Sequence, residues 1–194
     1  RREHARARVL PRKCEMRRLP GLFQCFDQEK DFGGHTVREY TYNSAHLVLT
    51  ATEHPASGVN YTVTSTYDGQ SRLATLTTSG GLLSTYTYGA DAFLQKVVES
   101  ISGTPLRTNA YTWLNAQMRT HTDPRNLTRT FTYDPANLID LTEVRDHSGH
   151  LVAAYTYNGG HQVLTATRYP GDGSSYLTQY TYDLGQPKTR LTPA

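Results

Sequence analysis

The sequence predicts an all-β fold in which about seven consecutive β-hairpins pair into one extended, twisted antiparallel sheet. Three observations lead to this prediction. A three-residue box with Thr at its centre, in most copies flanked by two aromatic residues, recurs every 20–25 residues. A second alternating run follows each box, and Gly, Pro, Asn or Asp marks the turns. A period of this length leaves room for two short strands and two turns, but not for a helix.

The composition favours an ordered chain with a modest core. Leu, Ile, Val and Phe make up about 19% of the 194 residues, but 14 Tyr and 28 Thr replace the missing aliphatic side chains. Tyr and Thr both suit the pleated surface of a sheet. The formal net charge of +3 is too small to favour disorder.

Residues 1–34 differ in kind from the remainder. They hold 9 of the 20 basic residues and both cysteines, Cys14 and Cys25, and they contain no Tyr and no Thr. We expect a basic leader that is either disordered or foreign to the fold, followed by a repeat region at 35–194. A basic arm for nucleic acid or a membrane is the alternative interpretation. The spacing of the cysteines does not match a zinc site and leaves a disulfide and free thiols both open.

The repeat region carries 11 basic and 12 acidic residues without a basic cluster. This balance argues against a nucleic-acid partner. No apolar run approaches the roughly 20 residues that cross a bilayer. We therefore expect neither nucleic-acid binding nor a membrane span.

The aromatic residues of the boxes define the repeats. Because successive side chains of a strand point to opposite faces, the outer residues of each box share one face and the central Thr lies on the other. In the second box Ser65 takes the first place. The repeat-defining aromatic residues are Tyr40, Tyr42, Tyr67, Tyr86, Tyr88, Tyr111, Trp113, Phe131, Tyr133, Tyr155, Tyr157, Tyr180 and Tyr182.

Each box is followed by a turn and a second strand. The first, second and sixth repeats show this clearly, with turns at 43–45, 68–71 and 158–160 and second runs at Leu47–Thr52, Leu73–Thr77 and Val163–Thr167. Asn-Gly and Gly-Gly favour hairpins because they accept positive φ. The loops between hairpins have the same turn chemistry, as at 79–81 and 123–126.

These units resemble YD repeats, also called RHS (rearrangement hotspot) repeats, whose motif contains Tyr-x-Tyr-Asp followed by Gly-Arg-Leu. The matching segments are 66–73, 123–134 and 180–185, and the resemblance covers residues 35–194. Asp68, Asp134 and Asp183 keep the Asp of the motif. Asn43, Asn158, Gly89 and Leu114 replace it elsewhere, so we expect this position to form turns, with Leu114 as the exception.

The resemblance implies a strip of β-sheet like the one that forms a hollow shell in bacterial RHS proteins, insecticidal toxin complexes and teneurins. The chain would then be a structural fragment of a longer secreted or cell-surface protein. Its partners would be neighbouring repeats and a C-terminal toxin domain that the shell encloses or presents and that this sequence lacks. The family's aspartyl self-cleavage motif is missing, since Asp123-Pro124-Arg125-Asn126 has Asn where Gly belongs.

YD repeats have also been linked to carbohydrate binding. The alternative function is therefore an adhesion module that binds glycans through the Tyr rows, because polar-tipped aromatic rings suit such interfaces. Solvent-exposed rings would favour glycan binding, and packed rings would favour a wall.

We expect no enzyme activity, no cofactor and no metal site. His147 and His150 flank Ser148-Gly149, but no third ligand lies at a plausible spacing, so a polar turn is the favoured interpretation. No strand-turn-helix nucleophile elbow and no phosphate-binding loop is present.

Overall fold

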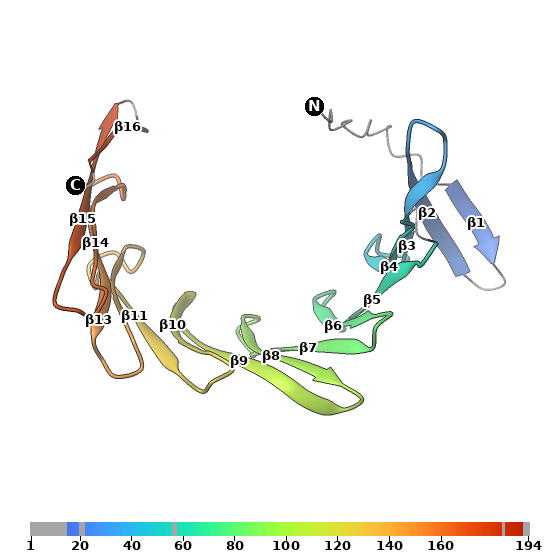
Figure 1. The fold of residues 1–194 in the computed structure, drawn as a ribbon, viewed down its shortest axis with the longest axis horizontal. Helices are drawn as coiled ribbons and strands as arrows, with labels where there is room; N and C mark the ends of the chain where they lie inside the picture. Colours follow the sequence, from blue (N-terminus) through green and yellow to red (C-terminus); the bar gives the residue numbers. More distant parts are fainter. Residues whose placement is uncertain (1–14, 20–21, 56–57, 184, 192–194) are drawn as a thin grey trace. The chain divides into compact units, whose positions relative to one another are not determined.

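The computed structural model describes residues 15–19, 22–55, 58–183 and 185–191. Sixteen antiparallel strands follow one another in sequence order, and each is hydrogen-bonded to its neighbours (Figure 1). This confirms the all-β fold of consecutive hairpins. The strands are β1 (Glu15–Leu19), β2 (Leu22–Lys30), β3 (Thr36–Tyr42), β4 (Val48–Glu53), β5 (Tyr61–Tyr67), β6 (Leu73–Thr78), β7 (Leu82–Tyr88), β8 (Leu94–Ile101), β9 (Thr104–Leu114), β10 (Gln117–Thr122), β11 (Thr128–Tyr133), β12 (Leu141–Arg145), β13 (Leu151–Tyr157), β14 (Val163–Arg168), β15 (Tyr176–Asp183) and β16 (Gln186–Leu191).

The seven predicted hairpins are β3–β4, β5–β6, β7–β8, β9–β10, β11–β12, β13–β14 and β15–β16. Every box lies in the first strand of its hairpin. The second runs predicted at Leu47–Thr52, Leu73–Thr77 and Val163–Thr167 correspond to β4, β6 and β14, within one residue at each end. The period-2 alternation therefore located both strands of these repeats.

Two further strands lie upstream of the boundary predicted at residue 34. Strand β1 pairs with β2, and β2 pairs with β3 from Cys25 opposite Tyr42 to Lys30 opposite Thr36. Leu22–Phe26 is rich in strand-forming residues, and the domain boundary at residue 34 stays a prediction. Residues 1–14, with Cys14, lie outside the described residues.

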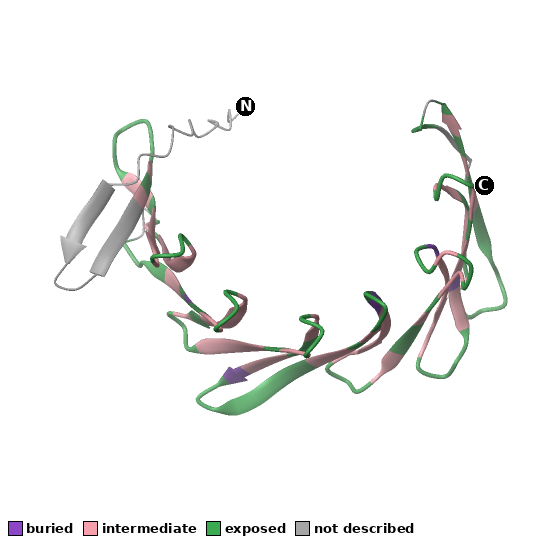
Figure 2. Ribbon diagram, turned by 180° about the vertical axis from the view of Figure 1, so that it is seen from behind, coloured by how far each residue is buried: buried purple, intermediate pink, exposed green. Residues whose placement is uncertain are grey.

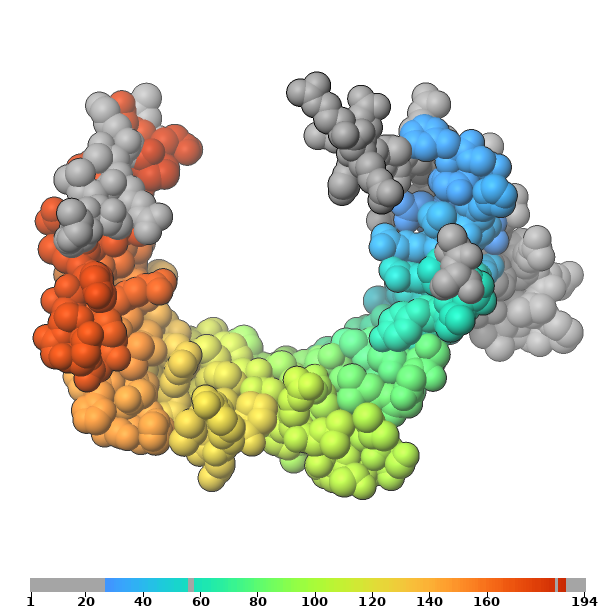
Figure 3. Space-filling model, in the orientation of Figure 1, coloured from blue at the N-terminus to red at the C-terminus, as the bar shows by residue number. Residues whose placement is uncertain are grey.

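By its internal contacts the chain divides into two units, 1–87 with 98–107, and 88–97 with 108–194. Among the residues whose burial is described, Ala153 is the one buried hydrophobic residue, at 7% exposure. Most strand residues are half-buried and the loops are exposed (Figure 2). The space-filling view shows a single layer in each unit (Figure 3). Backbone hydrogen bonds and side-chain contacts between neighbouring strands, rather than a central core, therefore hold each unit together.

A five-residue turn recurs six times with the same hydrogen bonds. The first residue is Asp or Asn, and its Oδ1 accepts the backbone N–H of the third and fifth residues at 2.8–3.0 Å. This side-chain acceptor mimics a backbone turn. The turns begin at Asp31, Asn43, Asp68, Asp123, Asp146 and Asn158.

The fourth residue of this turn has a positive φ in every copy, whichever residue stands there. The values are 80° at Gly34 and 82° at Gly149, but also 60° at His46 and 61° at His161. The turn that begins at Gly89 has Ala92 at this place with φ 67°. A side chain in the left-handed region is strained, and glycine is not.

Ala92→Gly is therefore expected to raise the free energy of unfolding by about 0.5–1 kcal/mol, because relief of strain exceeds the added chain entropy. Gly149→Ala should lower it by a similar amount, since a Cβ there meets no atom within 4 Å and only the backbone conformation opposes it. Urea denaturation followed by circular dichroism measures both. Opposite signs would contradict the assignment of strain.

Candidate functional site

The aromatic residues of the boxes are half-buried on one face of the sheet, and the central Thr lies on the other. All thirteen predicted aromatic residues are neither fully exposed nor fully buried, whereas the central Thr is exposed in six of the seven boxes. The Tyr rows are therefore partly packed against neighbouring strands. This placement weighs against the glycan-binding alternative, which needs exposed ring faces.

The last aromatic residue of a box reaches back to the preceding hairpin. Tyr67 Oη donates to the Val48 carbonyl at 2.8 Å, and Tyr182 Oη donates to the Val163 carbonyl at 2.8 Å. In the same way the Tyr157 hydroxyl bonds to the Leu141 carbonyl at 2.9 Å, and Trp113 Nε1 bonds to the Leu94 carbonyl at 2.7 Å. We call these four bonds the aromatic latches.

Every latch acceptor is the first residue of a second strand, and the ladder to the following strand does not reach Val48, Leu141 or Val163. The β4–β5 ladder stops at Thr50 opposite Thr64, so Val48 lies two residues outside it. In six hairpins the register shifts by one residue between the central Thr and the last aromatic residue. In three of them the resulting bulge lies directly beside a latch acceptor, namely Val48, Leu141 or Val163. The aromatic donor thus satisfies a carbonyl that the ladder leaves open.

Two boxes vary this arrangement. The ring of Tyr133 lies 5.5 Å from the guanidinium carbon of Arg119, in a cation–π contact. Trp113 also stacks on Phe93, with ring centroids 5.0 Å apart and an interplanar angle of 19°. In both boxes the last aromatic residue therefore contacts the preceding hairpin, including the box in which this residue is Trp113.

On the opposite face, threonine hydroxyls bond in pairs across four of the seven hairpins. The central Thr of a box lies 2.7 Å from a Thr of the second strand, as in Thr41 with Thr50 and Thr156 with Thr165. Thr66 with Thr75 and Thr112 with Thr120 show the same Oγ1–Oγ1 distance. Such pairs stabilise antiparallel strands, which accounts for the Thr at the centre of the box.

The three Asp residues of the motif occupy turns of different kinds. Asp68 begins a five-residue turn, and its Oδ2 also lies 2.7 Å from Arg72 Nε. Asp134 begins the longer loop before β12, and its Oδ1 accepts the Ala136 N–H at 2.8 Å. Asp183 pairs with Gln186 at the end of the β15–β16 hairpin. The structure does not bring these three residues together.

Leu114 departs from the motif because its hairpin uses another turn. Leu114 pairs directly with Gln117, and the two residues between them, Asn115 and Ala116, have φ of 53° and 63°. Two consecutive positive φ angles identify a type I′ turn, which needs no side-chain acceptor before it.

The turns couple the stability of the sheet to acid. The hydrogen bond from the Arg72 N–H lowers the pKa of Asp68 below 3.8, and that of the Leu127 N–H does the same for Asp123. A group with a depressed folded-state pKa contributes stability that is present above its unfolded pKa and is lost as pH falls through the folded value. This contribution therefore disappears below about pH 4.

Asp68→Asn is expected to weaken the acid sensitivity of the sheet, because the amide keeps the Oδ1 acceptor but does not titrate. Asn43 and Asn158 show that Asn serves in this turn. The measurement is the urea midpoint between pH 2 and 6, with Asn43→Asp as the reciprocal variant. If Asp68→Asn follows the wild-type pH profile unchanged, the pKa of Asp68 is not the cause.

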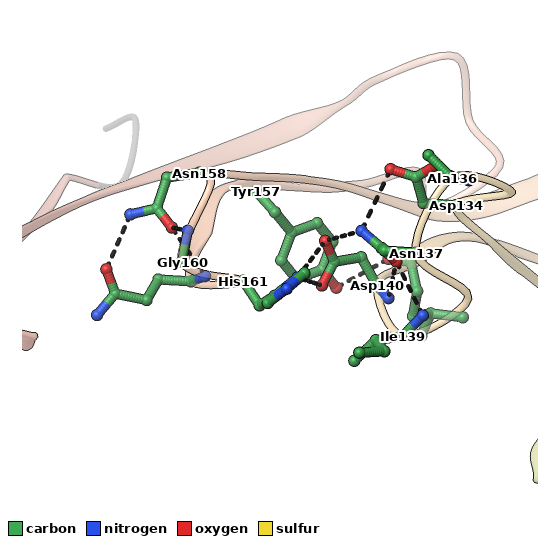
Figure 4. A network of polar contacts seen from close by, with 11 residues as sticks. Asp134, Ala136, Asn137, Ile139, Asp140, Tyr157, Asn158, Gly160 and His161 are labelled. Atoms are coloured by element: carbon green, nitrogen blue, oxygen red, sulfur yellow. Dashed lines mark hydrogen bonds and ion pairs between the residues drawn. The ribbon is translucent and has the colours of Figure 1, made fainter.

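A polar network joins two neighbouring hairpins (Figure 4). Asp140, only 6% exposed, precedes β12, and its Oδ2 accepts Asn137 Nδ2 at 2.8 Å and lies 3.1 Å from His161 Nδ1. His161 belongs to the β13–β14 turn, so the contact crosses from one hairpin to the next. The Asp140 carbonyl also accepts the Asp134 N–H at 2.8 Å.

Tyr157 lies beside this network (Figure 4). Burial raises the pKa of the Tyr157 hydroxyl above 10, and the negative charge of Asp140 adds to the rise. The hydroxyl therefore stays protonated and keeps donating to Leu141 over the physiological pH range. The network and the aromatic latch thus act on the same pair of hairpins.

The two histidines considered as a metal pair lie in the β12–β13 turn. His150 Nδ1 lies 3.5 Å from Asp146 Oδ2. The other carboxylate oxygen, Asp146 Oδ1, accepts the backbone N–H groups of Ser148 and His150 and so holds the turn. Within residues 15–191, where described, no three His, Cys, Asp or Glu side chains are placed to hold a metal ion. The described part of the chain also has no helix long and apolar enough to cross a membrane.

No family model matches the chain, and no curated protein matches it. Among solved structures, a crystal structure of TcdB2-TccC3-Cdc42 is similar over 91% of this chain, with a TM-score of 0.49 and 14% identity. A crystal structure of TcdB2-TccC3 is similar over 85%, with a TM-score of 0.41 and 15% identity. A porin-like protein from Bacteroides uniformis is similar over 92%, with a TM-score of 0.37 and 13% identity. The chain spans 13% of the first two of these chains and 91% of the third.

Proposed function

We propose that the chain is a structural repeat segment of a secreted or cell-surface RHS-type protein. In this role it forms part of a β-sheet shell that encloses or presents a C-terminal toxin domain. The observation that most supports the proposal is the set of aromatic latches, because they use the repeated rings to tie four of the hairpins to the one before. The resemblance of residues 35–194 to YD repeats supports the RHS assignment.

We also propose that the segment is not an enzyme. The groups that recur with the repeat are engaged in holding the sheet: Asp and Asn in turns, Thr in cross-strand pairs, and Tyr in latches. In the wall of a shell, such groups recur along the sheet and form hydrogen bonds with one another. In a catalytic site, they lie close together and remain available to a substrate.

The test uses the full-length product of the reading frame that encodes this chain. Limited proteolysis should leave a domain downstream of Ala194 intact while the repeats are folded. A variant with Tyr67, Tyr157 and Tyr182 all changed to Phe should expose that domain at lower denaturant concentration. The matched control changes Tyr40, Tyr155 and Tyr180, whose hydroxyls form no hydrogen bond with the described residues.

Two results would contradict the proposed shell. One is a reading frame that encodes no domain beyond the repeats. The other is a downstream domain that is cleaved equally fast whether the repeats are folded or not. Binding of the folded segment to an immobilised glycan, lost when the Tyr rows are changed, would favour the adhesion alternative.

A further inference from the structure

A polar hollow of about 420 Å³ lies in the second unit, where β10 and β11 meet the loop that follows β12. Its charged and polar lining comes from His121, Asp123, Arg125, Arg129, Asp146 and His147. We propose that this hollow binds a small organic molecule bearing an oxyanion, a carboxylate or a phosphate ester, through the guanidinium of Arg129. The proposal does not depend on the shell function.

Both carboxylates of the hollow are engaged by their own turns. Asp123 Oδ1 accepts two backbone N–H groups, and its Oδ2 accepts Arg125 Nη2 at 2.9 Å and Nε at 3.1 Å. Asp146 Oδ1 likewise accepts the N–H groups of Ser148 and His150 at 2.9 Å. The opposite charges of Asp123 and Arg125 therefore balance each other within one turn, whereas Asp146 keeps its negative charge and uses Oδ1 to hold its own turn.

The positive group without a partner is Arg129. Neither Arg129 nor His147 forms a hydrogen bond or an ion pair with any residue that the structure describes, and Arg129 is exposed. Arg129 lies directly opposite His121 in the β10–β11 ladder. A free guanidinium binds carboxylate and phosphate with two parallel N–H bonds, which gives an oxyanion both charge and geometry.

His121 is held in place beside Arg129. Its ring stacks on Tyr111 with centroids 5.0 Å apart and an interplanar angle of 9°, and its Nε2 lies 2.9 Å from Asn109 Oδ1. The wall of the hollow next to the guanidinium is therefore a fixed aromatic surface. Such a surface suits the carbon skeleton of a ligand whose charged end meets Arg129.

The size of the hollow selects the class of ligand. Its volume falls in the range of about 300–1,000 Å³ that is usual for small-molecule sites. An inorganic ion alone would leave most of that space filled with water. A small organic acid or sugar phosphate would occupy the hollow and reach both Arg129 and the stacked His121.

The experiment titrates the full chain with citrate and with glucose 6-phosphate, and follows the ring resonances of His121 and His147 by NMR. At least one probe should give saturable shifts at both histidines, and comparison of the two separates a carboxylate from a phosphate ligand. Arg129→Gln should weaken that binding by at least about tenfold, the effect of losing one charge-assisted bidentate contact. Arg168→Gln, at an exposed arginine of β14 outside the hollow, should leave the affinity unchanged.

Three results would overturn the proposal. They are shifts that never saturate with either probe, equal affinity in the Arg129→Gln variant, and equal shifts on addition of uncharged glucose. Sodium chloride at matched ionic strength controls for screening. The circular dichroism spectrum of each variant shows whether a loss of binding reflects a loss of fold.

Discussion

Changing Tyr67, Tyr157 and Tyr182 together to Phe is expected to lower the free energy of unfolding by about 3 kcal/mol, roughly 1 kcal/mol for each latch. Each substitution leaves a backbone carbonyl without its donor while the ring keeps its packing. The three sites lie in different repeats, so their effects should add. Urea denaturation at neutral pH, followed by circular dichroism, gives the three single values and their sum.

The matched control replaces the first aromatic of the box instead of the last. Tyr40, Tyr155 and Tyr180 are half-buried tyrosines at the first place of their boxes, but their hydroxyls make no hydrogen bond with the described residues. Their conversion to Phe should change stability by less than about 0.5 kcal/mol each. Equal losses in both sets would show that the hydroxyl bonds contribute nothing specific.

The Asp140→Ala variant is expected to lose about 2–3 kcal/mol of stability. The substitution removes the acceptor of Asn137 Nδ2 and the partner of His161 Nδ1 from a place that is almost fully buried. Denaturation of the variant at pH 7 measures the loss. Asp134→Ala, at an exposed turn of the same loop, should cost clearly less.

A double-mutant cycle isolates the part that crosses between hairpins. Asp140→Ala, His161→Ala and the double variant should give a coupling energy of about 0.5–1 kcal/mol, since the histidine side chain is 47% exposed and the pair is partly screened. Strict additivity would mean that the contact between Asp140 and His161 does not tie the hairpins together. The loss in Asp140→Ala would then belong to its own loop.

The strands could be predicted because the alternation of side chains between the two faces of a strand is visible in the sequence of that strand alone. The alternation of Val163–Thr167 needs only neighbouring positions, and the structure places β14 there. The same reasoning located the turn at 158–160, because Asn and Gly tolerate the backbone that a turn requires. The alternation within strands and the residue types in turns were therefore enough to predict the fold class and the order of the hairpins.

The contacts between hairpins were not predictable in this way. The acceptor of Tyr157 is the backbone carbonyl of Leu141, and a carbonyl leaves no mark on the sequence. Asp140 and His161 are 21 residues apart, and each reads as an ordinary loop residue. One signal was present, since the loop from Asp134 to Asp140 is longer than the recurrent five-residue turn and so has room for a group that reaches the next hairpin.

Strands β1 and β2, upstream of the repeat region, were missed for a different reason. Net charge and the lack of Tyr and Thr distinguished residues 1–34 as a different segment. Composition averages over a segment, however, and here it obscured the short strand-forming stretch at Leu22–Phe26, which pairs with β3. A strand of this length can form wherever a neighbour offers a free edge.

The latches have a consequence for how such a chain can change over generations. Their acceptor belongs to the main chain, so the tyrosine of one hairpin makes no demand on the side chains of the hairpin before it. The latch of a duplicated, deleted or exchanged repeat would find its acceptor in any neighbour without a compensating substitution. Gene segments encoding whole hairpins can therefore be recombined freely, and the side chains between the boxes can drift, provided that the donor ring and the length of the hairpin are kept.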